Sequence, residues 1–134
     1  MNKLTGKIIA IDSNQSMSLV DVDVGDAVFS ATLLETPETA AYLRVGQRVS
    51  VLFKETEVSL AKNLSGLISL RNRFAVTVLR ITRGAILSEV TLAFGDETLV
   101  SVITTRGVDR LQLVSGDPCE ALVKANEMVL SDEL

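Results

Sequence analysis

Three short clusters in the sequence carry the side chains best suited to bind a ligand. The first is Ser69–Asn72, where an arginine offers a planar fork of donors and its neighbours add a hydroxyl and an amide. The second is residues 83–89, RGAILSE, where Gly84 allows successive backbone N–H groups to converge on an anion. The third is a K-x-x-E pattern that occurs twice, at 54–57 and 124–127. Because these groups are donors with almost no base among them, they suit holding an anion better than transforming a substrate.

Each cluster also has an ordinary structural explanation. Polar residues of the first can cap a strand in a linker, the glycine of the second can form a β-turn, and a lysine at a strand end is usually solvated. A buried dianion needs about five to eight charge-assisted hydrogen bonds to offset its lost hydration. No single cluster provides that many, so we expect oxyanion binding only where clusters act together.

The composition excludes several classes of function. The 134 residues contain no histidine and a single cysteine, Cys119, which removes the commonest general base and the commonest ligands of transition metals. We therefore expect a protein that is not an enzyme and that has no metal-cation site and no organic cofactor. Cys119 is expected to be a structural residue on a half-buried strand.

Charge and hydropathy narrow the range of partners. A net charge of −4, an aromatic content of 4% and the absence of tryptophan are not typical of nucleic-acid binding. No window approaches the roughly 18 apolar residues of a membrane span, and the N-terminus lacks the pattern of a signal peptide. We expect a cytoplasmic protein with no nucleic-acid or membrane partner.

The chain repeats itself at an offset of 70 positions. Residues 43–60 (LRVGQRVSVLFKETEVSL) align with residues 113–130 (LVSGDPCEALVKANEMVL), and the same offset pairs Asn2 with Asn72 without a gap. A repeat of this length indicates two modules of about 60 residues rather than a solenoid. We expect the modules at 1–63 and 67–134.

Each copy has the pattern of a small strand-rich barrel. Alternating or β-branched runs predict strands near 7–11, 18–24, 27–34, 48–53 and 58–60, and again near 76–81, 88–94, 98–104, 119–124 and 128–130. Gly25-Asp26 and Gly95-Asp96 predict type II′ hairpin turns. A threonine and a proline predict a short helix at 36–43, with a weaker counterpart at 106–113.

Three strands, a short helix and two strands follow the order of a five-stranded OB-like barrel. The predicted fold class is all-β with short helices, built as two tandem OB-like barrels. We expect each copy to close its barrel with its own last strand. Association between copies or chains would bury more apolar surface than one barrel can alone.

The segments SLRNRF, RGAILSEVTL and LVSGDPCEALVKANEMVL resemble, in order and spacing, the Mop (TOBE) domain of molbindins. That domain also occurs in molybdate-responsive repressors and molybdate transporter ATPases, and the repeat makes this chain similar to a di-Mop molbindin. The resemblance implies OB-like barrels that bind molybdate or tungstate at interfaces between modules. The oxyanion-binding residues that it implies are Ser69, Arg71, Asn72, Ala85, Ile86, Leu87, Ser88, Lys124, Ala125 and Asn126, together with Lys54 of the first copy.

Both copies depart from the family pattern. In the second, Leu70 replaces a small residue, Arg83 replaces a lysine, and Leu87 and Ser88 stand where asparagine and alanine are common. The first copy has no counterpart of the serine and arginine of the starting motif. Beside its lysine, Glu55 replaces an alanine and would repel a dianion. The second copy therefore keeps more of the implied site.

These observations predict an intracellular protein that binds molybdate or tungstate for storage, buffering or sensing, without catalysis. One alternative is the effector-binding fragment of a molybdate-responsive transcription regulator. Another is an OB-type interaction module that binds no oxyanion. We expect a homo-oligomer, with a trimer favoured over a dimer.

Overall fold

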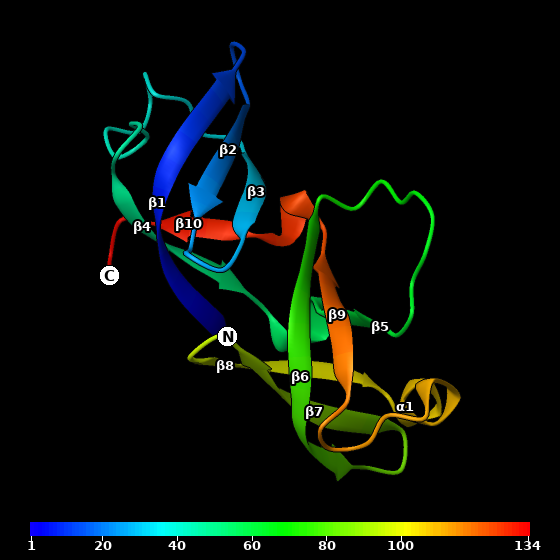
Figure 1. Cartoon of the computed structure of the whole chain (residues 1–134). Coiled ribbons are helices and arrows are strands. Elements are labelled where there is room, and N and C mark those ends of the chain that lie inside the picture. Colours follow the sequence, from blue (N-terminus) through cyan, green and yellow to red (C-terminus); the bar gives the residue numbers. More distant parts are fainter.

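Two curled antiparallel sheets of five strands form the protein, which the computed structural model describes over residues 1–134 (Figure 1). The first has the order β10-β4-β1-β2-β3 and contains β1 (Asn2–Ser13), β2 (Ser18–Asp23), β3 (Val28–Leu33), β4 (Arg48–Phe53) and β10 (Val129–Ser131). The second has the order β5-β9-β6-β7-β8 and contains β5 (Ser59–Ala61), β6 (Asn72–Arg83), β7 (Leu87–Phe94), β8 (Glu97–Thr104) and β9 (Pro118–Val123). The predicted all-β class with two five-stranded OB-like barrels is confirmed.

The two halves of the chain follow the same plan. The register of both long strands shifts at equivalent places, between Ile8 and Ala10 in β1 and between Val78 and Arg80 in β6. Short 3-10 turns, η1 (Glu55–Glu57) and η2 (Ala125–Glu127), follow β4 and β9. Both predicted hairpin turns are present, and in each only the glycine has a positive φ, 99° in the first and 56° in the second, as a type II′ turn requires.

The short helix lies in the second half, not in the first. Helix α1 (Thr105–Leu111) is capped by Thr104, which accepts a hydrogen bond from the Gly107 N–H at 3.0 Å. Pro37 stands at the equivalent position of the first half and has no N–H to donate. Residues 36–43 form only turns, so the helix predicted there is wrong and the weaker counterpart is the one that folds. The structure contains no apolar helix of the length that a membrane span requires.

The two sheets exchange their last strands. β5 comes from the first half but pairs with β9, which places Leu60 opposite Ala121. β10 comes from the second half but pairs with β4, which places Leu130 opposite Val51. The prediction that each copy closes its own barrel is therefore wrong. Similar closing strands meet similar sheet edges in the two halves, so the pattern that predicts the strands does not determine which sheet they join.

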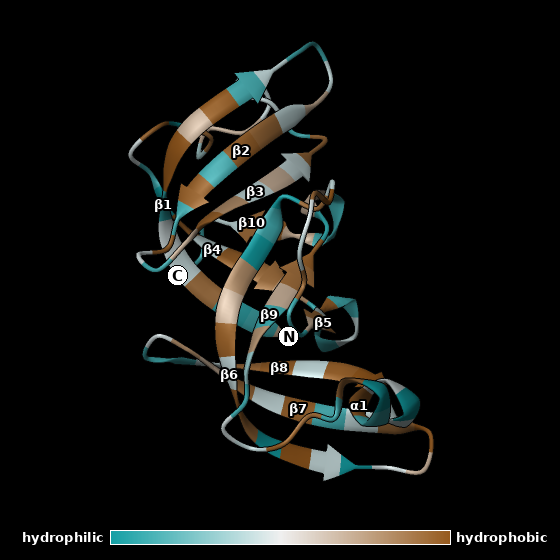
Figure 2. Cartoon of the chain, turned by 45° about the vertical axis from the view of Figure 1, so that its right-hand side comes forward, coloured by the Kyte–Doolittle hydropathy of each residue, from teal (hydrophilic) through white to brown (hydrophobic).

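One hydrophobic core runs through both halves. Most of its 26 buried residues lie on the strands, where Figure 2 shows brown segments alternating with white or teal ones, and the rest lie on α1 and the connecting turns. All four phenylalanines of the chain lie in it, and the rings of Phe29 and Phe74, one from each half, are 4.8 Å apart between centroids. Cys119 is buried in the same core, and burial raises the pKa of its thiol.

One asparagine of each half binds the edge strand of the other half. The amide of Asn72 donates to the Ser30 carbonyl at 2.9 Å and accepts from the Ser30 N–H at 2.7 Å. The amide of Asn2 makes the same pair of bonds with Val100, at 2.8 and 2.9 Å. Both asparagines are buried, with 1% and 6% of their surface exposed. Each amide thus satisfies backbone groups that an edge strand leaves unpaired.

The chain segment after β5 is also held against the second half. The Lys62 ammonium donates to the carbonyls of Leu111 and Gln112, both at 3.2 Å, and to the Asp117 carboxylate at 2.9 Å. Carbonyl groups at the end of a helix lack partners inside the helix. Lys62 therefore adds contacts between the exchanged segment and the second half, and it also caps the C-terminal end of α1.

We predict that Asn72→Ala lowers the free energy of unfolding by roughly 2–4 kcal/mol, because it leaves the buried N–H and C=O of Ser30 without partners. Urea denaturation followed by circular dichroism measures the change. Asn126→Ala, at an exposed position on η2, is the control and should change stability by less than about 0.5 kcal/mol. An Asn72→Ala protein as stable as the wild type would contradict this role.

Candidate anion-binding site

Two of the three predicted clusters line one hollow. Arg71 immediately precedes β6 and Lys124 immediately follows β9, and these strands are antiparallel neighbours with Asn72 opposite Val123. The topology therefore brings the first cluster beside the lysine of the third. The hollow has a volume of about 270 Å³ and is lined by Thr32, Ser69, Leu70, Arg71, Lys124, Ala125 and Asn126.

The two cations of this hollow are not neutralised within the chain. Arg71 and Lys124 are exposed and take part in none of its ion pairs. By contrast, the nearby Arg73 pairs with Glu120 at 2.8 Å, and its hydrogen bond lowers the pKa of that carboxyl. No carboxylate lines the hollow. Its local charge is therefore positive although the whole chain carries −4.

Thr32 is the residue of the hollow that the sequence did not predict. It lies on β3, in the first half, and reaches the site because β3 packs against η2. It is half-buried, and its hydroxyl makes no hydrogen bond within the chain. The family motifs do not include this position, and in the repeat it aligns with Val102, which has no polar group. No signal in the sequence points to it.

Asn72 lies next to the hollow but does not line it. Its side chain is buried and its amide binds the backbone of Ser30 through both of its polar atoms. The Asn72 amide holds β3 against the start of β6, and its contact with an oxyanion stays a prediction.

The predicted loop of residues 85–88 lies at the other end of β6 (Figure 1). It borders a second hollow, also of about 270 Å³, which shares no lining residue with the first. Ser88 is buried and its hydroxyl lies 2.7 Å from that of Thr105, which donates to the Gly84 carbonyl at 2.8 Å. The Ser88 hydroxyl is therefore occupied within the chain, and the loop is not part of the Arg71 hollow of the same molecule.

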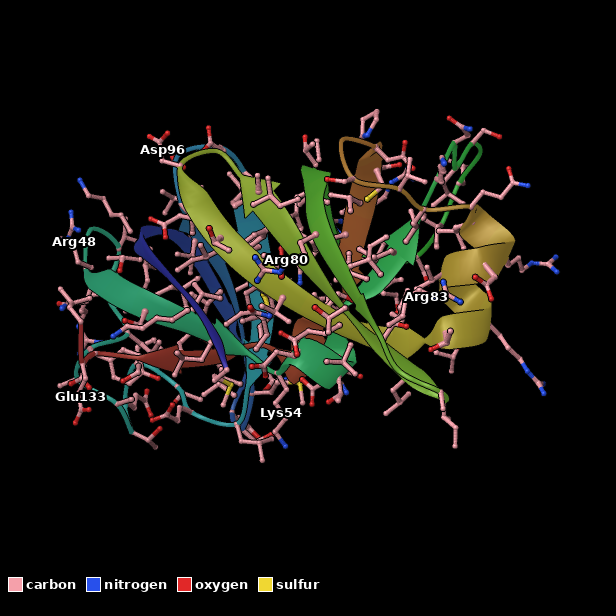
Figure 3. The ribbon with its side chains drawn as sticks, turned by 90° about the horizontal axis from the view of Figure 1, so that it is seen from below. Arg48, Lys54, Arg80, Arg83, Asp96 and Glu133 are labelled. Atoms are coloured by element: carbon pink, nitrogen blue, oxygen red, sulfur yellow. The ribbon has the colours of Figure 1, made fainter.

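The rest of this loop is presented outward. The side chains of Ile86 and Leu87 are 77% and 53% exposed, and the N–H groups of Ala85 and Ile86 donate to no group of the chain. Arg83 lies beside α1 (Figure 3) and pairs with Asp109 at 2.8 Å, which lowers the pKa of that carboxyl. The loop thus offers backbone donors rather than a free cation.

Lys54, at the end of β4 (Figure 3), does not line the Arg71 hollow. It borders a smaller hollow of about 190 Å³ whose lining includes the carboxylates of Glu57 and Glu127. The neighbouring Glu55 carboxylate lies 2.6 Å from the Met1 nitrogen, and this hydrogen bond lowers the pKa of Glu55. The surroundings of Lys54 are therefore much less favourable to an anion than those of Lys124.

Comparison with known sequences identifies related proteins of molybdenum transport. The TOBE domain matches residues 68–130. The molybdenum transport protein ModE of Herbaspirillum seropedicae is 32% identical over 133 residues, which are 97% of this chain and 49% of ModE. The molybdenum import ATP-binding protein ModC of Brucella abortus is 34% identical over 123 residues, 91% of this chain and 32% of ModC. The chain thus spans about half or a third of the length of these relatives.

A solved structure matches almost the whole chain. The crystal structure of the cytoplasmic molybdate-binding protein ModG, with molybdate bound, superposes with a TM-score of 0.90 at 30% identity. The match covers 97% of this chain and 94% of the ModG chain, so it spans both sheets. With its fold, its repeated motifs and this relative in agreement, the chain belongs to the Mop/TOBE family of molbindins.

Proposed function

We propose that the chain binds molybdate or tungstate reversibly in the hollow between Arg71 and Lys124, without catalysis. The observation that carries this proposal is the meeting of two unneutralised cations in a hollow lined by no carboxylate. The molybdate held by ModG, a relative along nearly the full length, supports the same class of ligand. Both anions are tetrahedral dianions of similar size, so the same donors suit either.

The donors of the hollow are close in number to those that a dianion requires. Arg71 can donate twice through its fork, Lys124 adds a second charge, and Thr32, Ser69 and Asn126 add neutral groups. These make about six hydrogen bonds, within the five to eight or so that offset the lost hydration of a dianion. The hollow is therefore adequate for capture, although its exposed cations also remain in contact with water.

We propose that a second copy of the chain covers the hollow. Its loop of residues 85–88 offers free backbone N–H groups and the exposed side chains of Ile86 and Leu87, which suit a contact that excludes water. Sites formed in this way lie between chains. We therefore propose a homo-oligomer, with a trimer favoured over a dimer.

The proposed role is storage, buffering or sensing of the oxyanion in the cytoplasm. Its relative ModG is a cytoplasmic protein, and the absence of histidine leaves no ordinary general base for catalysis. A second candidate role is the effector-binding part of a longer molybdate-responsive regulator. The similarity to ModE, of which the chain spans 49%, favours that candidate, and the extent of the complete reading frame decides between the two roles.

We predict that Arg71→Ala and Lys124→Ala each weaken molybdate binding by at least about 1 kcal/mol, because each removes a charge-assisted hydrogen bond. Calorimetric titration with molybdate, tungstate and sulfate in parallel measures the losses. In a double-mutant cycle the two losses should be non-additive, since both groups contact one ligand. Arg73→Ala is the matched control: its side chain is already paired with Glu120 and its loss should leave the affinity unchanged. Unchanged titration curves for both site variants, with native circular dichroism, would refute the proposed site.

We predict that Lys124→Ala weakens molybdate binding more than Lys54→Ala does. Lys124 lines a hollow without carboxylates, whereas the hollow of Lys54 includes Glu57 and Glu127. The same titrations test the order. Equal losses of affinity, or a larger loss for Lys54→Ala, would contradict this order.

We predict that the protein is a homo-oligomer at micromolar concentration, most favourably a trimer. Light scattering coupled to size-exclusion chromatography measures the mass, with and without molybdate. Ile86→Asp should lower the mass, because it places a charge in the proposed contact. A particle of 14.4 kDa, the mass of one chain, under both conditions would rule out sites between chains.

A further inference from the structure

The backbone that frames the Arg71 hollow occurs a second time in the first half of the chain. β1 pairs with β4, with Asn2 opposite Phe53, just as β6 pairs with β9. Lys54 and Lys124 have nearly the same backbone angles, φ −74° and ψ 148° against φ −66° and ψ 145°. η1 packs against β8 as η2 packs against β3. The first half therefore repeats the strand pair and the 3-10 turn that frame the site.

The decisive difference lies at the first residue of each 3-10 turn. Ala125 begins η2 and lines the Arg71 hollow with a methyl group. Glu55 begins η1 at the equivalent position and extends a carboxylate. The carboxylate oxygen lies 2.6 Å from the nitrogen of Met1, the residue that takes the place of Arg71 in the repeat. The Glu55 carboxylate thus bridges the two residues that correspond to Ala125 and Arg71 of the hollow.

We propose that the Glu55 carboxylate substitutes for the oxyanion in the first half and so keeps a second, latent anion site closed. This inference rests on the proposed function of the second-half hollow. A fixed carboxylate excludes a dianion by filling the space beside the turn and by like-charge repulsion. Glu55 then determines how many oxyanions each chain binds.

The cation of the latent site remains available. Lys54 is exposed and makes no ion pair with Glu55 or any other carboxylate. Two other positions of the latent site offer fewer hydrogen-bond donors than their counterparts. Met1 stands in place of Arg71 and has no guanidinium, and Val102 stands in place of Thr32 and has no hydroxyl. A site opened by removal of Glu55 should therefore bind molybdate about tenfold or more weakly than the Arg71 hollow, as expected for the loss of one or more charge-assisted bonds.

The test is calorimetric titration of the full chain with sodium molybdate, with native circular dichroism required of every variant. Glu55→Ala should bind more molybdate per chain than the wild type. It should also restore binding in the Arg71→Ala/Lys124→Ala background, in which the second-half hollow is disabled. Adding Lys54→Ala to that triple variant should abolish the restored binding.

Glu38→Ala is the control, because it removes the same charge from an exposed position of the first half that lines neither the Arg71 hollow nor the Lys54 hollow. It should add no molybdate. If Glu55→Ala adds none either, or if Glu38→Ala adds as much, the latent site is refuted while the wild-type titration still supports the second-half site. A wild type that binds no molybdate would instead remove the proposed function itself.

Discussion

Backbone hydrogen bonds between β5 and β9, and between β10 and β4, tie the two halves of the chain together. Because each sheet receives its fifth strand from the other half, neither sheet is complete without both halves. The exchange also brings the inner faces of the two sheets onto one core, where Phe29 and Phe74 touch across the junction. The reciprocal asparagine amides and the Lys62 contacts reinforce the same junction.

The proposed site takes its geometry from this junction. Lys124 stands where the chain leaves β9 to cross into the first sheet, and Arg71 stands where it enters β6. Thr32 joins them from the first half because Asn72 holds the β3 edge in place. The starting motif of the second copy therefore combines two tasks in adjacent residues: Arg71 faces the proposed ligand, and Asn72 fixes the strand that completes the hollow.

The sequence predicts those features that depend on local chemistry. The strand positions follow from alternation and β-branching, and the hairpins follow from Gly25 and Gly95, which adopt the positive φ values required. The sequence pattern does not predict the exchange of the closing strands, because the exchange depends on a long-range choice between two similar sheet edges. The helix predicted at 36–43 does not form, because the first half lacks both partners of the capping hydrogen bond of α1: Leu34 stands in place of Thr104, and Pro37 in place of Gly107. In the site, the motifs located Arg71 and Lys124, but Thr32 comes from a strand that carries no motif.

The distance in sequence between β4 and β10 also constrains how the protein is made. Synthesis on the ribosome proceeds from the N-terminus, so four strands of the first sheet emerge long before residues 129–131, which complete it. Until then β4 presents an open edge, and a nascent chain with an open edge is prone to pair with a neighbouring one. The exchange that stabilises the finished molecule therefore delays completion of its first sheet until residues 129–131 have been translated.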